Sequence, residues 1–90
     1  MKSTKLVIYG KVQGVNLRSN ILLKAQSLGI NGYVKNNPDR ISVECVLHST
    51  PKNIHKMIDY IKSNPGRARI EDIKIKVLDL PKNKGFRIDF

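Results

Sequence analysis

The residues from Gly10 to Arg18 have the types and spacing expected of an anion-binding loop. Gly10 and Gly14 allow backbone conformations in which N–H groups turn inward toward an anion. A helix is predicted to begin at Leu17, so its positive end and its unpaired N–H groups would face the same place. Arg18, in the first helical turn, adds a planar fork of donors that suits phosphate. The segment therefore predicts a cradle of phosphate size.

This loop lacks the pattern of a nucleotide P-loop. Only three residues separate Gly10 from Gly14, and no Lys-Ser or Lys-Thr pair follows to reach phosphate and magnesium. A nucleotide triphosphatase is therefore excluded. The spacing alone does not distinguish an anion cradle from an ordinary turn followed by a solvated Arg18.

A second candidate, Asn36, follows the strand-like segment Gly32–Lys35 and begins the turn sequence Asn36-Asn37-Pro38-Asp39. Taken alone, Asn36 is best interpreted as a turn residue. Paired with the loop that holds Arg18, it becomes a candidate functional residue.

The first half of the chain contains the elements that must position both candidates. Lys5–Tyr9 is a short β-branched apolar run and predicts a buried strand. Apolar residues recur at helical spacing over Leu17–Leu28, and Gly29 can end that helix. Alternation over Ile41–Leu47 predicts a strand that forms a hairpin with Gly32–Lys35.

The second half supplies another helix and two strands. Thr50 and Pro51 predict a helix start, and an apolar stripe continues from there until Asn64-Pro65-Gly66. A looser strand pattern over Ala68–Val77 has an irregularity near Glu71-Asp72, and a turn at 82–85 precedes the alternating segment Phe86–Phe90. The order β-α-β-β-α-β plus one further short strand predicts an α+β, ferredoxin-like split β-α-β sandwich, with a mixed sheet and both helices on one face.

Length and composition favour a single intracellular domain spanning residues 1–90. Apolar residues make up 40% of the chain, enough for a packed core. Cys45 is the only cysteine, which points to a reducing compartment. The apolar run Leu6–Tyr9 is too short for a signal-peptide core or a membrane span. We therefore expect a cytoplasmic protein that does not enter membranes.

A net charge of +10 predicts attraction to anions, including phosphates, acidic metabolites and nucleic acid. The basic residues are scattered over the whole chain, so charge alone does not choose among these partners. The strand Ile41–Leu47 contains no aromatic residue on which bases could stack. A nucleic-acid-binding module therefore ranks behind a small-molecule phosphate ligand.

Two motifs together resemble the acylphosphatase signature. The first is Gly-Lys-Val-Gln-Gly-Val from Gly10 to Val15, followed after two residues by Arg18. The second is Gly-Tyr-Val-Lys-Asn from Gly32 to Asn36. The likeness covers nearly the whole chain, including the element order, the Thr50-Pro51 helix start and the C-terminal strand with its aromatic residues.

The resemblance implies an enzyme that hydrolyses the carboxyl-phosphate bond of acyl phosphates to carboxylate and inorganic phosphate. Arg18 and Asn36 would be catalytic, with Asn36 holding the attacking water. The phosphate-binding loop would comprise Gln13, Gly14, Val15, Asn16, Leu17 and Arg18. Because the carboxylate leaves easily, in-line attack by water would need positioning and charge stabilisation, without metal, cofactor or covalent intermediate.

Three positions depart from the family pattern. Leu17 stands where the family usually has Phe, and Asn16 replaces a small residue. No glycine follows Asp39 in the hairpin turn. Leu17 keeps an apolar anchor with less volume under Arg18, and Asn16 is expected to cap the helix. The departures beside the cradle leave open a silent acylphosphatase-like module that binds phosphate or nucleic acid.

Other functional sites are less well supported by the sequence. Cys45, His48 and His55 lack a recognised metal-ligand spacing and a fourth partner, so no metal site is expected. Cys45 is interpreted as a small core residue. We expect a monomer, and the sequence does not indicate which acyl phosphate is the physiological substrate.

Overall fold

The computed structural model describes residues 3–81 and 84–89, and these form two helices and five strands. Their order confirms the predicted β-α-β-β-α-β arrangement with one further strand. In chain order the elements are β1 (Ser3–Lys11), α1 (Leu17–Leu28), β2 (Asn31–Asn36), β3 (Ser42–His48), α2 (Pro51–Lys62), β4 (Arg69–Leu78) and β5 (Phe86–Asp89).

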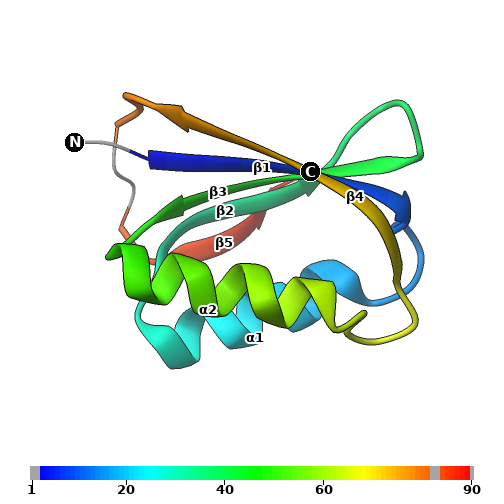
Figure 1. Cartoon of the computed structure of the whole chain (residues 1–90), viewed down its shortest axis with the longest axis horizontal. Helices are drawn as coiled ribbons and strands as arrows, with labels where there is room; N and C mark the ends of the chain where they lie inside the picture. Colours follow the sequence, from blue (N-terminus) through cyan, green and yellow to red (C-terminus); the bar gives the residue numbers. More distant parts are fainter. Residues whose placement is uncertain (1–2, 82–83, 90) are drawn as a thin grey trace.

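The five strands form one mixed sheet in the order β4-β1-β3-β2-β5. All neighbouring strands are antiparallel except β2 and β5, which run parallel. Both helices lie against the same face of the sheet, and among the described residues none forms a helix over the other face (Figure 1). The predicted α+β, ferredoxin-like fold is confirmed.

The core lies between the helices and the sheet. Strand residues of one parity face the helices, because successive side chains point to opposite faces of a strand. Each large aliphatic side chain buried here contributes about 1.5–3 kcal/mol by leaving water. The residues with no solvent exposure include Leu6, Ile8, Val34, Val43, Cys45 and Leu47 from the sheet, and Ile21, Ala25, Met57 and Ile61 from the helices.

Two predicted boundaries agree well with the structure. Helix α1 covers Leu17–Leu28, and Gly29 ends it in the left-handed conformation, at φ 67°. Helix α2 begins after Thr50, whose side chain accepts a hydrogen bond from the Asn53 amide at 3.3 Å. The irregularity predicted near Glu71-Asp72 is also present, because the β1–β4 register shifts between Tyr9 and Gly10 and leaves Glu71 without a direct partner.

The bounds of several strands differ from the predictions, and the first and third strands show why. The first strand extends from Ser3 to Lys11, since its pairing with β4 continues beyond the apolar run. Ile41 was expected to open the third strand but belongs to the preceding turn. Its side chain is 57% exposed, and its N–H donates to Asp39 Oδ1 at 3.0 Å, which closes the turn before β3 begins at Ser42.

Some predicted features fall where the structure gives no description. Lys82 and Asn83, in the predicted turn at 82–85, lie outside the described residues, as does Phe90 at the end of the last strand. Within the described part of the chain, neither helix has the length and apolar character needed to cross a membrane.

Candidate active site

The loop between β1 and α1 has a backbone shape suited to binding an anion. Gly14 and Asn16 both have positive φ, at 71° and 64°, whereas Val15 between them does not. Alternating left- and right-handed residues turn successive N–H groups toward one side and form an anion-binding concavity. The loop thus has two left-handed residues, and the second of them is Asn16 rather than a glycine.

The N-terminus of α1 has no side-chain cap among the described residues, and its first turn contains no acidic residue. The prediction that Asn16 caps the helix is therefore wrong. Capping residues normally have extended backbone, which lets the side chain reach back to the first-turn N–H groups. Asn16 is instead left-handed, and its side chain makes no capping hydrogen bond to these N–H groups. Helix α2, by contrast, is capped by its own Thr50.

A small pocket of about 180 Å³ opens at this helix end. Of the six residues predicted to bind phosphate, Gly14, Asn16, Leu17 and Arg18 line it, together with Val12 and Ser19. Arg18 is half-buried and Leu17 is 1% exposed. The pocket thus combines a guanidinium group, a helix N-terminus and a turned loop in a space that suits a phosphoryl group.

The other two predicted loop residues, Gln13 and Val15, do not line this pocket but hold the loop in place. The carbonyl of Val15 accepts the Arg67 N–H at 3.0 Å, and its side chain is buried. The side-chain amide of Gln13 donates to the carbonyl oxygens of Asn37 at 2.8 Å and Ser42 at 2.9 Å. Sequence reasoning missed these positioning roles, although Pro65-Gly66 marked the turn that packs on Val15.

Asn36 ends β2 on the face that points toward the helices, the same face as the buried Val34. It pairs in register with Val43, which pairs on its other side with Ile8 of β1. Asn36 does not line the small pocket, but Gln13 bonds to the residue that follows it. The two predicted catalytic residues therefore belong to segments that are hydrogen-bonded to each other.

The side-chain carbonyl oxygen of Asn36 is buried and has no hydrogen-bond partner among the described residues. A buried polar atom without a partner costs about 1–3 kcal/mol, so most are satisfied in native structures. An Oδ1 atom without a protein partner is expected at this position if the Asn36 side chain accepts a hydrogen bond from a water molecule.

The remaining candidates for chemistry are placed elsewhere. Cys45 is fully buried, and that burial raises the pKa of its thiol well above the usual range, so it is not a nucleophile. His55 is exposed on α2, with its Nε2 3.7 Å from Asp59. Within the described residues, no group of three His, Cys, Asp or Glu side chains is placed to hold a metal ion.

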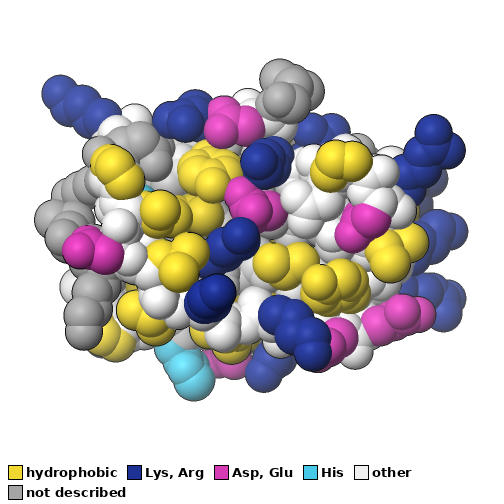
Figure 2. Space-filling view, turned by 90° about the horizontal axis from the view of Figure 1, so that it is seen from above, with side chains coloured by type: hydrophobic (Ala, Val, Ile, Leu, Met, Phe, Trp, Pro, Cys, Tyr) yellow, Lys and Arg dark blue, Asp and Glu magenta, His cyan; other side chains and the backbone are white. Residues whose placement is uncertain are grey.

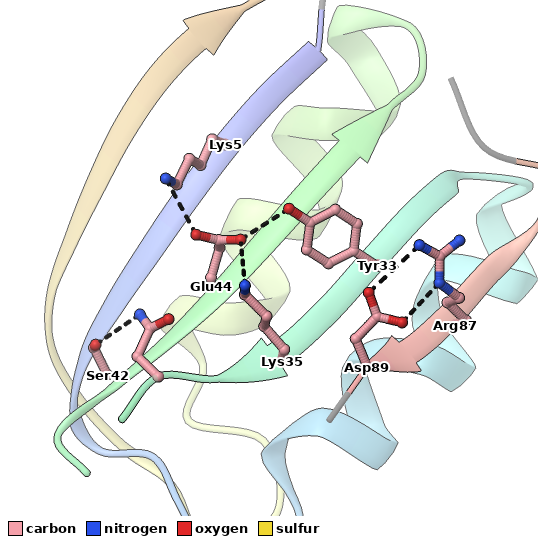
Figure 3. A network of polar contacts seen from close by, with 8 residues as sticks. Lys5, Tyr33, Lys35, Ser42, Glu44, Arg87 and Asp89 are labelled. Carbon is pink, nitrogen blue, oxygen red and sulfur yellow. Dashed lines mark hydrogen bonds and ion pairs between the residues drawn. The ribbon is translucent and has the colours of Figure 1, made fainter. Parts of the chain in front are cut away.

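A polar network on the sheet face away from the helices holds β2 in position (Figure 3). The Glu44 carboxylate lies 3.1 Å from Lys5 and 3.6 Å from Lys35, and it accepts the Tyr33 hydroxyl at 2.8 Å. Burial and the hydrogen bond to Glu44 raise the pKa of Tyr33 to about 12. Burial alone would raise the pKa of Glu44, but hydrogen bonds from Tyr33 and Lys5 lower it.

Comparison with known proteins identifies the family. A sequence model of the acylphosphatase family matches residues 4–88. The chain belongs to the acylphosphatase family. It is 38% identical over 89 residues to an acylphosphatase from Thermoplasma volcanium, covering 98% of each chain. It is 40% identical over 88 residues to an acylphosphatase from Caldanaerobacter subterraneus subsp. tengcongensis, covering 97% of each.

Solved acylphosphatase structures share the fold. The crystal structure of the Bacillus subtilis acylphosphatase matches with a TM-score of 0.92 at 23% identity, covering the whole of both chains. The structure from Coxiella burnetii matches with a TM-score of 0.89 at 25% identity, covering 98% of this chain and 92% of that one. The resemblance drawn from the two motifs is confirmed, and the alternative of a silent acylphosphatase-like module that binds phosphate or nucleic acid is not favoured.

The departures from the acylphosphatase pattern have clear structural settings. Leu17 is almost completely buried beneath the start of α1, as its apolar character predicted. Arg40 follows Asp39 where a glycine is usual, and it adopts a left-handed φ of 66°. A non-glycine residue in this conformation costs about 1–2 kcal/mol. The turn retains its shape because Asp39 accepts hydrogen bonds from the amides of Ile41 and Ser42.

Proposed function

We propose that this acylphosphatase hydrolyses acyl phosphates through Arg18 and Asn36, with water as the nucleophile. The observation that carries the proposal is the pocket at the uncapped N-terminus of α1, into which Arg18 and the turned loop also converge. A helix N-terminus without a side-chain cap presents backbone N–H donors and the positive end of the helix dipole, which suit an anion. The pocket volume of about 180 Å³ suits a phosphoryl group better than a nucleotide.

In this mechanism the amides of the loop from Gln13 to Arg18 and the Arg18 guanidinium bind the phosphoryl oxygens. Arg18 supplies two parallel N–H donors, which match the geometry of phosphate oxygens. Charge that develops on these oxygens in the transition state meets donors that are already oriented, so little reorganisation is needed.

The Asn36 side-chain carbonyl accepts a hydrogen bond from the attacking water and orients it in line with phosphorus. This role for Asn36 is supported by its buried Oδ1 atom, which has no hydrogen-bond partner among the described residues. The water oxygen forms a bond to phosphorus as the bond from phosphorus to the acyl oxygen breaks. One proton of the water passes to a phosphate oxygen, and the products are a carboxylate and dihydrogen phosphate.

The carboxylate is a good leaving group, so no general acid is needed and no group of the enzyme becomes phosphorylated. The two residues therefore act by positioning and by electrostatic stabilisation. We further propose that the chain works as a monomeric, single-domain cytoplasmic enzyme. The buried, unreactive Cys45 is compatible with this setting.

The test is hydrolysis of benzoyl phosphate in the presence of EDTA by wild type, Arg18→Ala and Arg87→Ala. We expect wild-type turnover, a loss on the order of 10²–10³-fold in Arg18→Ala, and near-normal activity in Arg87→Ala. Arg87 is the matched control because it lies on the open face of the sheet, bonded to Asp89 at 2.7 Å. Absence of turnover by folded wild type would contradict the proposal, as would full activity in Arg18→Ala.

A further inference from the structure

The side-chain amide of Asn20 connects the phosphate loop to α2. Its Nδ2 atom donates to the Asn16 carbonyl at 2.7 Å, and its Oδ1 atom accepts the Tyr60 hydroxyl at 3.3 Å. Asn20 is the fourth residue of α1, and Tyr60 lies in the last turn of α2. The two bonds therefore join one helix to the loop across the other helix. We call Tyr60, Asn20 and the Asn16 carbonyl the amide relay.

The amide relay lies in the helix layer of the molecule. Figure 1 shows α1 and α2 on one face of the sheet, and Figure 2 shows the opposite face, where basic and acidic side chains are mixed with hydrophobic ones. The Tyr60 side chain packs against the core, and the Lys24 Nζ atom lies 5.3 Å from the centre of its ring. These contacts hold the Tyr60 hydroxyl close to α1.

The Tyr60 hydroxyl favours one orientation of the Asn20 amide. A side-chain amide has a donor end and an acceptor end. With Oδ1 toward Tyr60, the Nδ2 atom faces the Asn16 carbonyl and donates to it, whereas the reversed amide would place two oxygen atoms against each other. The turn at Gly66 confines the amide from another side, because a Cβ at Gly66 would lie 3.0 Å from Nδ2.

The bond from Asn20 fixes a peptide unit at the edge of the phosphate pocket. The Asn16 carbonyl and the Leu17 N–H belong to one planar trans peptide, so they point in opposite directions. A donor on the carbonyl therefore also fixes the direction of the Leu17 N–H, one of the first-turn amides that have no partner inside the helix. Asn16 and Leu17 both line the pocket. In the proposed mechanism, the loop amides that bind phosphoryl oxygens include this N–H.

The side-chain bond supports a backbone conformation that is unfavourable by itself. Asn16 has a left-handed φ of 64°, which residues other than glycine adopt infrequently. The Asn20 N–H also donates to the Asn16 carbonyl, but at the longer distance of 3.2 Å. The shorter bond from Nδ2 gives the same carbonyl a second donor, and so stabilises the loop in the conformation that forms the pocket.

We infer that Asn20 is a positioning residue for phosphate binding and that Tyr60 acts through it. The inference rests on the proposed function and adds to it two residues from outside the loop. Asn20 does not line the pocket, so it acts by orienting the Leu17 N–H rather than by touching the phosphoryl group. Phosphate affinity and KM should therefore depend on Asn20 more strongly than kcat does.

The test compares Asn20→Leu with Asn20→Thr in binding of inorganic phosphate and hydrolysis of benzoyl phosphate. Leucine keeps a branched side chain without a donor, whereas a threonine hydroxyl can donate to the carbonyl four residues earlier in a helix. We expect Asn20→Leu to weaken phosphate binding and raise KM roughly tenfold, while kcat falls less than about threefold. Asn20→Thr should bind phosphate within about threefold of wild type.

The amide proton of Leu17 reports the same effect directly in NMR spectra. Saturating inorganic phosphate should move its signal downfield in wild type, as expected for an N–H that donates to an anion, and should move it less in Asn20→Leu. The matched control is Ser27→Ala, which removes a bond of 2.8 Å from a side chain of the same helix to the Lys24 carbonyl, away from the pocket. Phosphate affinity, kcat and the Leu17 signal should stay unchanged in this control.

Tyr60→Phe tests whether α2 contributes through the amide relay. Loss of the hydroxyl should weaken phosphate binding by about two- to fivefold, because the Asn20 amide loses its preferred orientation. In the Asn20→Leu background the same substitution should have no further effect, since residues of one hydrogen-bond network are not additive. Additive losses of phosphate affinity would overturn the role assigned to Tyr60.

Unchanged phosphate affinity in Asn20→Leu, with wild-type hydrolysis intact, would overturn the inference and leave the proposed function standing. Equal losses in Asn20→Leu and Asn20→Thr would also overturn it, because packing rather than a donor would then explain the effect. If wild type binds phosphate without hydrolysing benzoyl phosphate, the proposed hydrolysis fails, and the phosphate titrations alone show whether Asn20 positions the loop. If wild type does neither, both proposals fail.

Discussion

The Nε2 atom of Gln13 lies 2.8 Å from the carbonyl oxygen of Asn37, and this bond joins the phosphate loop to the strand end that carries Asn36. The same Nε2 donates to the Ser42 carbonyl at 2.9 Å, so both amide hydrogens are used. Both acceptors also have backbone donors, from Arg40 to Asn37 at 3.3 Å and from Asn37 to Ser42 at 3.1 Å. The Gln13 side chain therefore fixes the distance between the loop and the strand end that carries Asn36. Its two acceptors would each keep a backbone donor without it.

Replacing Gln13 by Leu should lower kcat with little change in phosphate affinity. The loop keeps its own shape, but its separation from Asn36 is no longer fixed, and an error near 1 Å can cost up to about a hundredfold in rate. We expect kcat for benzoyl phosphate to fall roughly ten- to hundredfold, while the inhibition constant of inorganic phosphate changes less than about threefold. Gln26→Leu, on the exposed side of α1, is the matched control. A parallel fall in phosphate affinity would show that Gln13 shapes the cradle instead.

The roles of Gln13 and Asn16 show where sequence reasoning reached its limit. The bounds of α1 were predictable because apolar spacing and Gly29 are local signals. The bonds from Gln13 to Asn37 and Ser42 span 24 and 29 residues, so no local pattern encodes them. Asn16 was predicted to cap α1 from residue type alone, but capping depends on backbone conformation, and its left-handed φ was not readable from the sequence.

Ile41 and Asn36, in the β2–β3 hairpin, show the same difference between local sequence signals and tertiary contacts. Ile41 continued the apolar alternation of its strand, but the bonds to the Asp39 carboxylate place it in the turn. Asn36 was singled out by a family motif, since turn chemistry alone favoured a structural role. Its unpartnered buried oxygen is a tertiary property, because it depends on which groups the fold brings near β2.

Replacing Asn36 by Leu should abolish most activity without lowering stability. The variant lacks the carbonyl that we propose orients the water, so kcat should fall on the order of 10²–10³-fold. It also removes a buried polar atom without a partner, so the free energy of unfolding should stay equal or rise by about 1 kcal/mol. Rates of benzoyl phosphate hydrolysis and urea denaturation measure the two effects.

Asn37→Leu provides the stability control for this substitution. The Asn37 side chain donates to Ser42 Oγ at 2.9 Å, so its loss should reduce the free energy of unfolding by about 1 kcal/mol. If Asn36→Leu destabilises the protein as much as Asn37→Leu does, the Asn36 carbonyl has a structural partner and the assigned role is wrong.

Gly66 and Gly29 offer a matched pair for testing how tightly the phosphate loop is packed. Both have left-handed backbone, at φ 66° and 67°. A Cβ at Gly66 would lie 2.7 Å from the Val15 carbonyl oxygen and 3.0 Å from Asn20 Nδ2, whereas a Cβ at Gly29 would meet nothing within 4 Å. Alanine at either position costs about 1–2 kcal/mol through backbone conformation alone.

Gly66→Ala should therefore cost more stability than Gly29→Ala and should also reduce activity. The added methyl group pushes against Val15, whose carbonyl accepts the Arg67 N–H, and so displaces the loop that we propose binds phosphate. We expect kcat/KM for benzoyl phosphate to fall at least roughly tenfold in Gly66→Ala and to change less than about twofold in Gly29→Ala. Equal activity in the two variants would mean that the loop absorbs the methyl group without moving.

The hydrogen bond between Tyr33 and Glu44 predicts that the difference in stability between wild type and Tyr33→Phe changes with pH in the alkaline range. Burial, followed by the bond to Glu44, raises the pKa of Tyr33 from 10.0 to about 12. A group whose pKa is raised by folding stabilises the protein below its unfolded pKa, and this contribution is lost as pH rises through the folded pKa. The unfolded chain loses the phenol proton from pH 10 upward, whereas the folded chain keeps it until about pH 12.

Wild type should therefore be more stable than Tyr33→Phe at pH 7, because the variant lacks the 2.8 Å bond to Glu44, and the difference should shrink between pH 10 and pH 12. Urea denaturation of both proteins across this range measures it, and titration of the other basic and phenolic groups cancels in the comparison. A difference that stays constant from pH 7 to pH 12 would show that folding does not shift the Tyr33 pKa, and that the network on the open face contributes packing rather than a directed hydrogen bond.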